Sequence, residues 1–446
     1  MKITVIGGGL CGCEAAFAAA NRGCEVELIE MKPSEHSPAH HSDLLAELVC
    51  SNSLKAARVE SAAGLLKEEM RRLGSVCMEA AAVSSVAAGG ALAVDRDIFS
   101  RYITDRIQSH PNITVVHRRA DAVPREGICV VATGPLTDGQ LAADIGSLCG
   151  QEYLSFFDAA APIVTYDSID MRIAFTASRY GRGEADEGDY INLPMNKEEY
   201  ERFYDALING ESAPLKSFDR QPNVYEGCMP IEIMAKRGAD TIRFGPLKPV
   251  GLRDPRTGHR PWAVAQLRRE NAAGTLYNLV GFQTNLKFGE QKRIFSLLPG
   301  LENAEFMRYG VMHRNSFINS PAVLKNDLSM RAHDNIFFAG QLSGVEGYME
   351  SASSGILAGI NAAARAKGEA SLVLPDFTML GALTAYITDP TVEKFQPMGA
   401  NFGVLPPLEE KIRDKKARYA ALAARSLAWF DENIHEHQVA EIGKGE

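Results

Sequence analysis

The feature that most constrains the fold is a glycine-rich turn between two apolar segments at the start of the chain. Residues 2–6 are apolar and rich in β-branched side chains, the pattern of a buried parallel strand. Gly7, Gly9 and Gly12 follow in the order G-x-G-x-x-G, and the alanine-rich residues 13–21 predict a helix. The turn therefore stands where a strand passes directly into a helix, as it does in dinucleotide-binding folds.

A second predicted strand, residues 25–29, completes this unit and ends on Glu30. Glu30 lies 18 residues beyond Gly12, and a carboxylate in that place accepts a hydrogen bond from a ribose 2′-hydroxyl. Gly7 permits the tight turn, Gly9 lets the backbone approach a pyrophosphate, and the amino end of the helix offers N–H groups to the phosphates. The unit predicts dinucleotide binding. The alternative is a glycine-rich turn that binds no ligand.

Two later segments favour FAD over NAD as the dinucleotide. Residues 128–134 and 335–341 are apolar strands that end in glycine-containing turns, and a helix of small residues, 351–366, follows the second one. Many FAD enzymes with two dinucleotide-binding domains close the flavin site with such a late strand–glycine–helix unit. The expected FAD contacts are Gly7, Gly8, Gly9, Leu10, Cys11, Gly12, Glu30, Lys32, Gly340 and Gln341.

The predicted architecture is α/β, with a Rossmann-like FAD-binding domain of the glutathione-reductase type and an inserted α+β domain. The alternation of strands and helices fades near residue 160. The strand-like runs that follow are separated by loops and short helices and lie at 161–166, 171–176, 241–244 and 276–282. We expect the FAD-binding domain to comprise residues 1–160 and 325–446, and the inserted domain residues 161–324.

Further elements are expected on both sides of the inserted domain. Apolar residues at helical spacing predict helices at 55–74 and 95–107, the second with Asp95 as its N-cap. Residues 113–116 predict a strand. The C-terminal part is expected to begin with one helix and to end in a basic helix near 408–430.

Composition and charge exclude several classes of protein. The chain has 446 residues and a net charge of −9, so an RNA contact requires a local basic patch. No apolar run reaches the ~18 residues that a membrane span needs. The eight cysteines are spread along the chain and do not suggest a disulfide framework. We expect a cytoplasmic protein with reduced cysteines, no membrane association and no stable protein partner.

Cys50 and Cys228 are candidates for a nucleophilic thiolate. Both have polar neighbours and lie near glycine, serine or proline, whereas the other six cysteines lie mostly among apolar residues. A reactive thiolate needs partial exposure and a positive or hydrogen-bonding environment. From context alone, each is as readily a loop cysteine without a catalytic role. Because His36, His40 and His41 fit no standard zinc spacing, no metal is expected.

Two further candidates follow the late glycine turn. Glu346 and Tyr348 belong to the segment 344–350, which the late strand would place beside the flavin ring. Either side chain can act as an acid or a base. The alternative is a structural turn that precedes the helix at 351–366.

Several segments together resemble one family, the folate- and FAD-dependent tRNA (uracil-5-)-methyltransferases of bacteria. The similarity runs from end to end, and the two cysteine segments are specific to this family. The segments are residues 7–16, 48–53, 225–232, 244–252, 340–351 and 401–403. The related wobble-uridine modifying enzymes share the FAD fingerprint but are longer, with an added C-terminal helical domain.

The resemblance implies a reaction and a set of roles. Methylenetetrahydrofolate donates a one-carbon unit, reduced FAD supplies electrons, and the methyl group goes to C5 of the uridine at position 54 in the tRNA T-loop. NAD(P)H is the expected reductant of the flavin. Cys228 is implied as the nucleophile that adds to uracil C6, and Cys50 as the thiol beside the flavin, although the sequence alone does not fix which is which. The family pattern has His where this chain has Asn285, which cannot stack comparably near the folate.

A basic face near the C-terminus is the expected RNA contact. Lys411, Lys415 and Arg418 would share one face of the predicted helix, and phosphate contacts of this kind make binding salt-dependent. An alternative basic cluster comprises Lys236, Arg237 and Arg260.

Three other functions remain open from the sequence. The same chemistry can act on ribosomal RNA, because the choice of target lies in surface shape. A small-molecule flavin oxidoreductase needs neither RNA nor a nucleophilic cysteine. In a flavin-bearing RNA-binding protein without catalysis, Cys228 would be dispensable.

Overall fold

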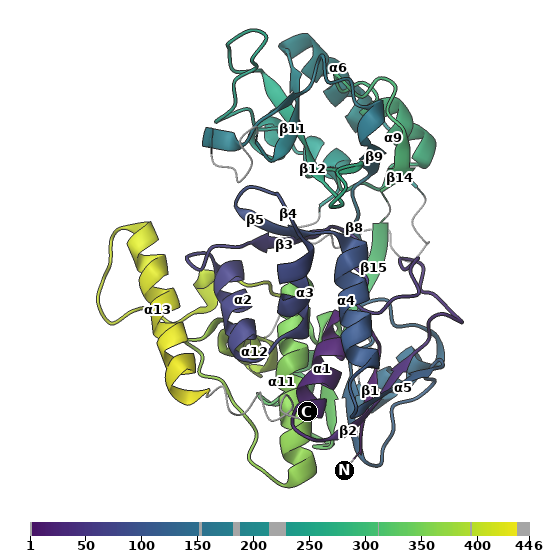
Figure 1. The fold of residues 1–446 in the computed structure, drawn as a ribbon, viewed down its shortest axis with the longest axis vertical. Helices are drawn as coiled ribbons and strands as arrows, with labels where there is room; N and C mark the ends of the chain where they lie inside the picture. Colours follow the sequence, from purple (N-terminus) through teal and green to yellow (C-terminus); the bar gives the residue numbers. More distant parts are fainter. Residues whose placement is uncertain are drawn as a thin grey trace, which may run out of the picture.

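Two units are stacked along the long axis of the molecule (Figure 1). The lower unit combines the amino- and carboxyl-terminal parts of the chain, and the upper unit contains the middle of the chain. An antiparallel strand pair, β8 (Leu154–Ala159) and β15 (Met312–Phe317), lies between them. The computed structural model describes residues 2–150, 154–181, 188–213, 229–310, 312–392 and 395–434.

The lower unit is built on a five-stranded parallel sheet with the order β16-β7-β1-β2-β6. Its strands are β1 (Lys2–Ile6), β2 (Glu25–Glu30), β6 (Ile113–His117), β7 (Ile128–Val131) and β16 (Ile336–Phe338). Alternate residues of these strands enter two different cores. Val5 and Val130 belong to one cluster, whereas Ile6 and Val131 belong to another on the opposite face. This burial on both faces explains why the strands are apolar without alternation.

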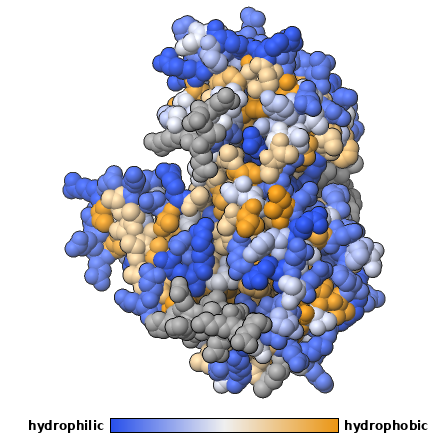
Figure 2. All heavy atoms as spheres, viewed as in Figure 1, coloured by the Kyte–Doolittle hydropathy of each residue, from blue (hydrophilic) through white to orange (hydrophobic). Residues whose placement is uncertain are grey.

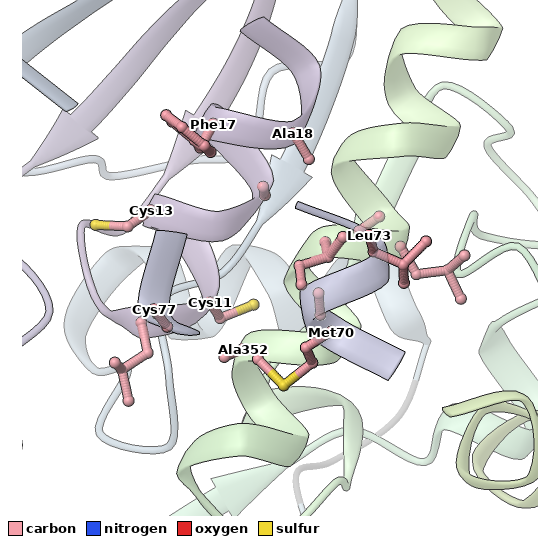
Figure 3. Close-up of a cluster of buried hydrophobic side chains, with 14 of the residues drawn as sticks. Cys11, Cys13, Phe17, Ala18, Met70, Leu73, Cys77 and Ala352 are labelled. Carbon is pink, nitrogen blue, oxygen red and sulfur yellow. The ribbon is translucent and has the colours of Figure 1, made fainter. Parts of the chain in front are cut away.

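Helices cover both faces of this sheet. Most of the first core comes from α1 (Leu10–Ala20), α2 (Ala62–Arg72), α3 (Val76–Ser84), α4 (Arg96–Gln108), α11 (Tyr348–Lys367) and α12 (Met379–Thr388). The second core includes α5 (Gly139–Cys149). Figure 3 shows Cys11, Met70 and Ala352, from α1, α2 and α11, directed into one common cluster. The Rossmann-like arrangement expected from the sequence, a parallel sheet with helices on both faces, is confirmed.

The upper unit has its own sheet and its own core. Six strands in the order β10-β11-β12-β13-β9-β14 pair antiparallel to one another. They are β9 (Ile163–Thr165), β10 (Phe175–Thr176), β11 (Tyr190–Met195), β12 (Ala263–Arg269), β13 (Leu276–Leu279) and β14 (Phe306–Arg308). The helices α6 (Lys197–Ile208), α7 (Ile231–Ala235), α8 (Thr241–Phe244) and α9 (Phe288–Phe295) complete it. The domain boundaries near residues 160 and 324 remain predictions.

Some expected elements are wrong or shorter than predicted. Thr241–Phe244 forms the short helix α8 and no strand. Its β-branched and aromatic residues favour a strand locally, but Ile242 is fully buried in the core of the upper unit, and this packing decides the conformation. The predicted helix at 55–74 is shorter, because β3 (Ser53–Ala56) comes first and the Ser61 side chain caps α2 by accepting from Gly64 N at 3.1 Å.

The remaining parts of the lower unit are a small sheet, the cap of α4 and the C-terminal helix. The strands β4 (Ser85–Val86) and β5 (Ala91–Val94) form a small antiparallel sheet with β3. The predicted N-cap of α4 is confirmed, because the Asp95 side chain accepts from Asp97 N and Ile98 N. The basic C-terminal helix is α13 (Lys415–Asn433), which begins later than predicted. Among the helices of the described ranges, none is both long and apolar enough to cross a bilayer.

The two helices that begin beside the glycine turns, α1 and α11, pack unusually closely. A Cβ atom at Gly359 of α11 would lie 2.3 Å from the carbonyl oxygen of Ala15 in α1, and one at Gly355 would lie 2.2 Å from that of Cys11. These glycines therefore set the separation of the helices, because a backbone oxygen cannot move aside as a flexible side chain can.

We predict that Gly359→Ala destabilises the protein by about 1–3 kcal/mol, because the methyl group must push the two helices apart. Thermal unfolding measures the effect. Gly289→Ala in α9 is the matched control, since a Cβ atom there meets nothing within 4 Å. That control should be neutral or slightly stabilising. Equal melting temperatures for the two variants would contradict this account of the helix contact.

Candidate functional site

The first glycine turn combines two obligatory glycines with one that faces open space. Gly7 has φ +104°, and a Cβ atom there would lie 2.5 Å from the carbonyl oxygen of Ala132, the residue directly after β7. A Cβ atom at Gly12 would lie 1.7 Å from the oxygen of Gly7. One at Gly9 would meet nothing within 4 Å, and Gly9 lines a cavity. Gly7 and Gly12 are thus required by the fold, whereas Gly9 leaves room for a ligand beside the backbone.

This cavity has a volume of about 480 Å³, within the range of small-molecule sites. It extends from the first glycine turn to the late one and to a loop that contains Cys50. Apart from Gly12, every site residue predicted within the described ranges lines it: Gly7, Gly8, Gly9, Leu10, Cys11, Glu30, Lys32, Cys50, Gly340, Gln341, Glu346 and Tyr348. The remaining predicted residue, Cys228, lies outside the described residues.

Glu30 is buried at the end of β2 and braces the turn. Its Oε2 accepts from Gly8 N at 2.6 Å, and its Oε1 accepts from Lys32 N at 3.0 Å. A carboxylate offers about four lone-pair sites, so these two bonds leave acceptor capacity toward the cavity. The Lys32 ammonium donates to the carbonyl oxygen of Leu44. These residues and the open space at Gly9 fit the ribose and pyrophosphate of FAD.

Cys50 is paired with Tyr348 at the start of α11. The Tyr348 hydroxyl donates to Cys50 Sγ at 3.1 Å and accepts from the backbone amides of Cys50 and Ser51 at 2.7 and 3.2 Å. Burial raises the pKa of Tyr348 well above its usual value, so the hydroxyl keeps its proton. A hydrogen bond from a neutral hydroxyl favours the thiolate form of Cys50.

The upper unit holds the same loop from the other side. Arg268 on β12 donates to Ser51 Oγ at 2.8 Å and to Asn52 Oδ1 at 3.0 Å. Arg308 on β14 donates to the carbonyl oxygen of Val49. Both arginines are largely buried, and both interact electrostatically with Cys50. Guanidinium groups stay charged at neutral pH, so they add a positive field that also favours a thiolate.

The side-chain amide of Asn52 hydrogen-bonds the Cys50 loop to both units. Its Nδ2 donates to Val94 O at 3.1 Å in the lower unit and to Arg269 O at 2.9 Å in the upper unit. A further pair, Arg96 and Glu270, forms a buried salt bridge across the same junction. The Cys50 loop is thus fixed by partners from both units.

The late turn supplies a second set of polar groups. Gln341 Nε2 donates to Glu346 Oε2 at 3.0 Å, and Glu346 N donates to Met398 O at 2.9 Å. Glu346 is buried and lines the cavity, so a carboxylate is available to a ligand there.

A pair of site residues was not predicted as such. Lys55 Nζ lies 2.6 Å from Glu350 Oε1, and both side chains line the cavity. Lys55 has a left-handed φ of 64°, a strained conformation that marks functional loops. Burial also lowers the pKa of the nearby Lys67 to about 8. Glu350 lies within the segment singled out after the late turn, but nothing local links it to a lysine 295 residues away.

Two of the three histidines considered as metal ligands, His36 and His40, interact with residues nearby in the sequence. His36 Nε2 lies 3.0 Å from Asp43 Oδ1, and His40 Nδ1 lies 2.6 Å from Ser37 Oγ. His40 lines the cavity. In the described part of the chain, no three His, Cys, Asp or Glu side chains gather as metal ligands would.

The predicted basic helical face is only partly correct. Lys411 precedes α13 and cannot share a helical face with the other two residues. Lys415 and Arg418 lie in the first turn of α13, each over the ring of Tyr419 at 5.5 and 5.6 Å. Figure 2 shows hydrophilic residues over the amino end of this projecting helix.

Comparison with known proteins identifies close relatives. A family model described as "Glucose inhibited division protein A" matches residues 2–370. A methylenetetrahydrofolate–tRNA-(uracil-5-)-methyltransferase TrmFO of Acetivibrio thermocellus is 57% identical over 98% of this chain and 99% of its own length. The protein of the same name from Desulforamulus reducens is 55% identical over 99% of each chain.

Solved structures give the same fold. The structure of Aquifex aeolicus GidA in its form II crystal superposes with a TM-score of 0.70 at 17% identity and covers 98% of this chain and 74% of that one. The form I crystal gives a TM-score of 0.69 at 18% identity.

We predict that Gly9→Leu yields a folded protein without flavin, because the side chain projects into open space where the pyrophosphate must lie. Absorbance in the flavin region and thermal unfolding measure the two properties. The wild type should be yellow. A wild type that stays colourless after incubation with FAD would contradict the assignment, as would a Gly9→Leu variant that retains flavin.

Proposed function

This chain belongs to the glucose-inhibited division protein A family, and we propose that it acts as a methylenetetrahydrofolate–tRNA-(uracil-5-)-methyltransferase. Its substrate is the uridine at position 54 of the tRNA T-loop, its carbon donor is 5,10-methylenetetrahydrofolate, and its cofactor is FAD. The observation that carries the proposal is a thiol, Cys50, at the cavity that extends from the glycine turn, in a chain 57% identical to a relative of that name. NAD(P)H as the flavin reductant remains a prediction.

Bound FAD, in its reduced form, would supply the two electrons needed to reduce the transferred methylene group to a methyl group. The chain's own contribution is to hold it. The open face of Gly9 and the amino end of α1 receive the pyrophosphate, and Glu30 receives the ribose. The cavity then leads to the start of α11, where Tyr348 and Glu346 meet the Cys50 loop.

Methylation at C5 of uracil needs a nucleophile in the protein, because C5 reacts poorly by itself. A thiolate that adds to C6 gives C5 the character of an enolate, and its elimination restores the ring after C5 has lost its proton. We assign this role to Cys228. Support comes from Ile231, three residues further on, whose N–H donates to the carbonyl oxygen of Gln283 at 2.7 Å, because Gln283 lines the cavity.

Cys50 then serves on the flavin side. Its hydrogen bond from Tyr348 and its buried arginine neighbours favour a thiolate that protects or assists the one-carbon unit before transfer. Glu346 is a buried carboxylate at the same cavity, beside Tyr348 in the chain, and we assign it the role of moving a proton.

The test of the function is one-carbon transfer in vitro. Labelled methylenetetrahydrofolate should label a tRNA transcript that contains U54 and should not label a transcript with cytidine there. Labelling of ribosomal RNA in place of tRNA would show that ribosomal RNA is the substrate. Flavin turnover without label in any RNA would support a small-molecule oxidoreductase.

A 5-fluorouridine RNA tests the two cysteines separately. Fluorine at C5 cannot leave as a proton does, so a thiolate adduct at C6 persists. We expect a covalent protein–RNA band with the wild type and with Cys50→Ala, and none with Cys228→Ala. Cys50→Ala should nevertheless lose methyl transfer. A band that survives Cys228→Ala and disappears with Cys50→Ala would reverse the two roles.

A further inference from the structure

One segment of the inserted domain, residues 236–260, concentrates positive charge in a chain that is otherwise acidic. Between residues 236 and 260 there are seven Lys and Arg against two Asp, whereas the whole chain has a net charge of −9. One of the two aspartates, Asp254, is held by Arg256 through paired hydrogen bonds at 3.0 and 2.7 Å. Most of the remaining cations are exposed, among them Lys248 and Arg260. Such a local excess attracts a polyanion.

Aromatic rings in and directly after this segment are exposed to solvent. Phe244 is 71% exposed, more than any other large hydrophobic residue in the described ranges, and Trp262 is 37% exposed. The guanidinium of Arg243 lies 3.8 Å from the ring centre of Trp262 and 5.4 Å from that of Phe244. Its Nε donates to Trp262 O at 3.0 Å, which fixes it close to both rings. Aromatic rings interleaved with arginine form the surface on which unpaired bases stack.

A third exposed ring, that of Tyr180, belongs to a segment that is hydrogen-bonded to the loop near residue 250. Tyr180 is 62% exposed, and its N–H donates to Gly251 O at 2.9 Å. The neighbouring Arg179 donates to Val250 O at 2.9 Å. The loop near residue 250 is therefore held in place, and the rings on either side of it are presented by a fixed backbone.

Strand β12 joins this segment to the catalytic cavity. Trp262 immediately precedes β12, and Arg268 near its other end donates to Ser51 and Asn52 in the Cys50 loop. Six residues of strand span roughly 20 Å. An RNA that places its target uridine at the cavity is thus within reach of these exposed aromatic rings.

We propose that this basic aromatic face, residues 236–262 with Tyr180, binds the RNA substrate. The basic side chains contact phosphates, and Phe244 stacks on an unpaired base. The inference rests on the proposed function and names the surface through which the inserted domain takes its RNA.

The central test is tRNA binding by the flavin-loaded protein. Phe244→Ala should raise the Kd for tRNA by about five- to a hundredfold, as expected for the loss of one stacked base, and Phe244→Trp should restore it. Phe288→Ala is the matched control. Phe288 is 55% exposed, stacks on Tyr309 and lies outside residues 236–262. It should bind as the wild type does. The flavin spectrum and melting temperature should not change.

Charge and fluorescence give independent readouts. The double variant Lys248→Glu/Arg260→Glu should weaken tRNA binding. It should also reduce the slope of log K against log salt concentration by the equivalent of roughly one to two phosphate contacts. The chain has two tryptophans, so in a Trp429→Phe background tRNA should quench the emission of Trp262. A KM for tRNA that rises in Phe244→Ala while kcat is retained would further support a binding role.

Three outcomes would overturn the inference. The first is wild-type binding by both the Phe244→Ala and the charge-reversed proteins, and the second is weakened binding only when Lys411, Lys415 and Arg418 are reversed. If charge reversal weakens binding but Phe244→Ala does not, the stacking assignment fails. A wild type that neither binds nor methylates tRNA contradicts the proposed function itself, which separates the two failures.

Discussion

The site depends on the close contact between α1 and α11. Because Gly355 and Gly359 lie against backbone oxygens of α1, the amino ends of two helices from opposite ends of the chain meet at one cavity. One end follows the first glycine turn, where its N–H groups would face a phosphate of the dinucleotide. The other begins at Tyr348, which places its hydroxyl against Cys50. A bulkier residue in this contact would separate the cofactor turn from the thiol.

The Cys50 loop joins this arrangement to the inserted domain. Tyr348 holds it from the lower unit, and Arg268 and Arg308 hold it from the upper unit. The inserted domain, on which a substrate could dock, is therefore hydrogen-bonded directly to the Cys50 loop. The same guanidinium groups supply the positive field that a thiolate requires.

Local patterns predicted the dinucleotide unit well, because its turn, helix and strands are specified by adjacent residues. The strand expected at 241–244 is wrong, because burial of Ile242 outweighs its local preference. The cavity partners of the thiol could not be predicted in this way. Arg268 lies 217 residues from Ser51, and Arg308 lies 259 residues from Val49, so only the folded chain brings them together. Cys228 was a candidate from its polar neighbours and the nearby glycine and proline, but only the family resemblance implied its role as the nucleophile.

The most direct test of the account is the pH dependence of Cys50 alkylation, followed by mass spectrometry of its peptide. Tyr348→Phe removes the hydrogen bond to the sulfur, and Arg308→Met removes a buried positive charge. Each should move the alkylation midpoint to higher pH, because each removes a group that favours the thiolate. Arg293→Met, at an exposed surface pair with Glu290, is the control and should leave the midpoint unchanged. Identical midpoints for Cys50 in all three variants and the wild type would contradict the account.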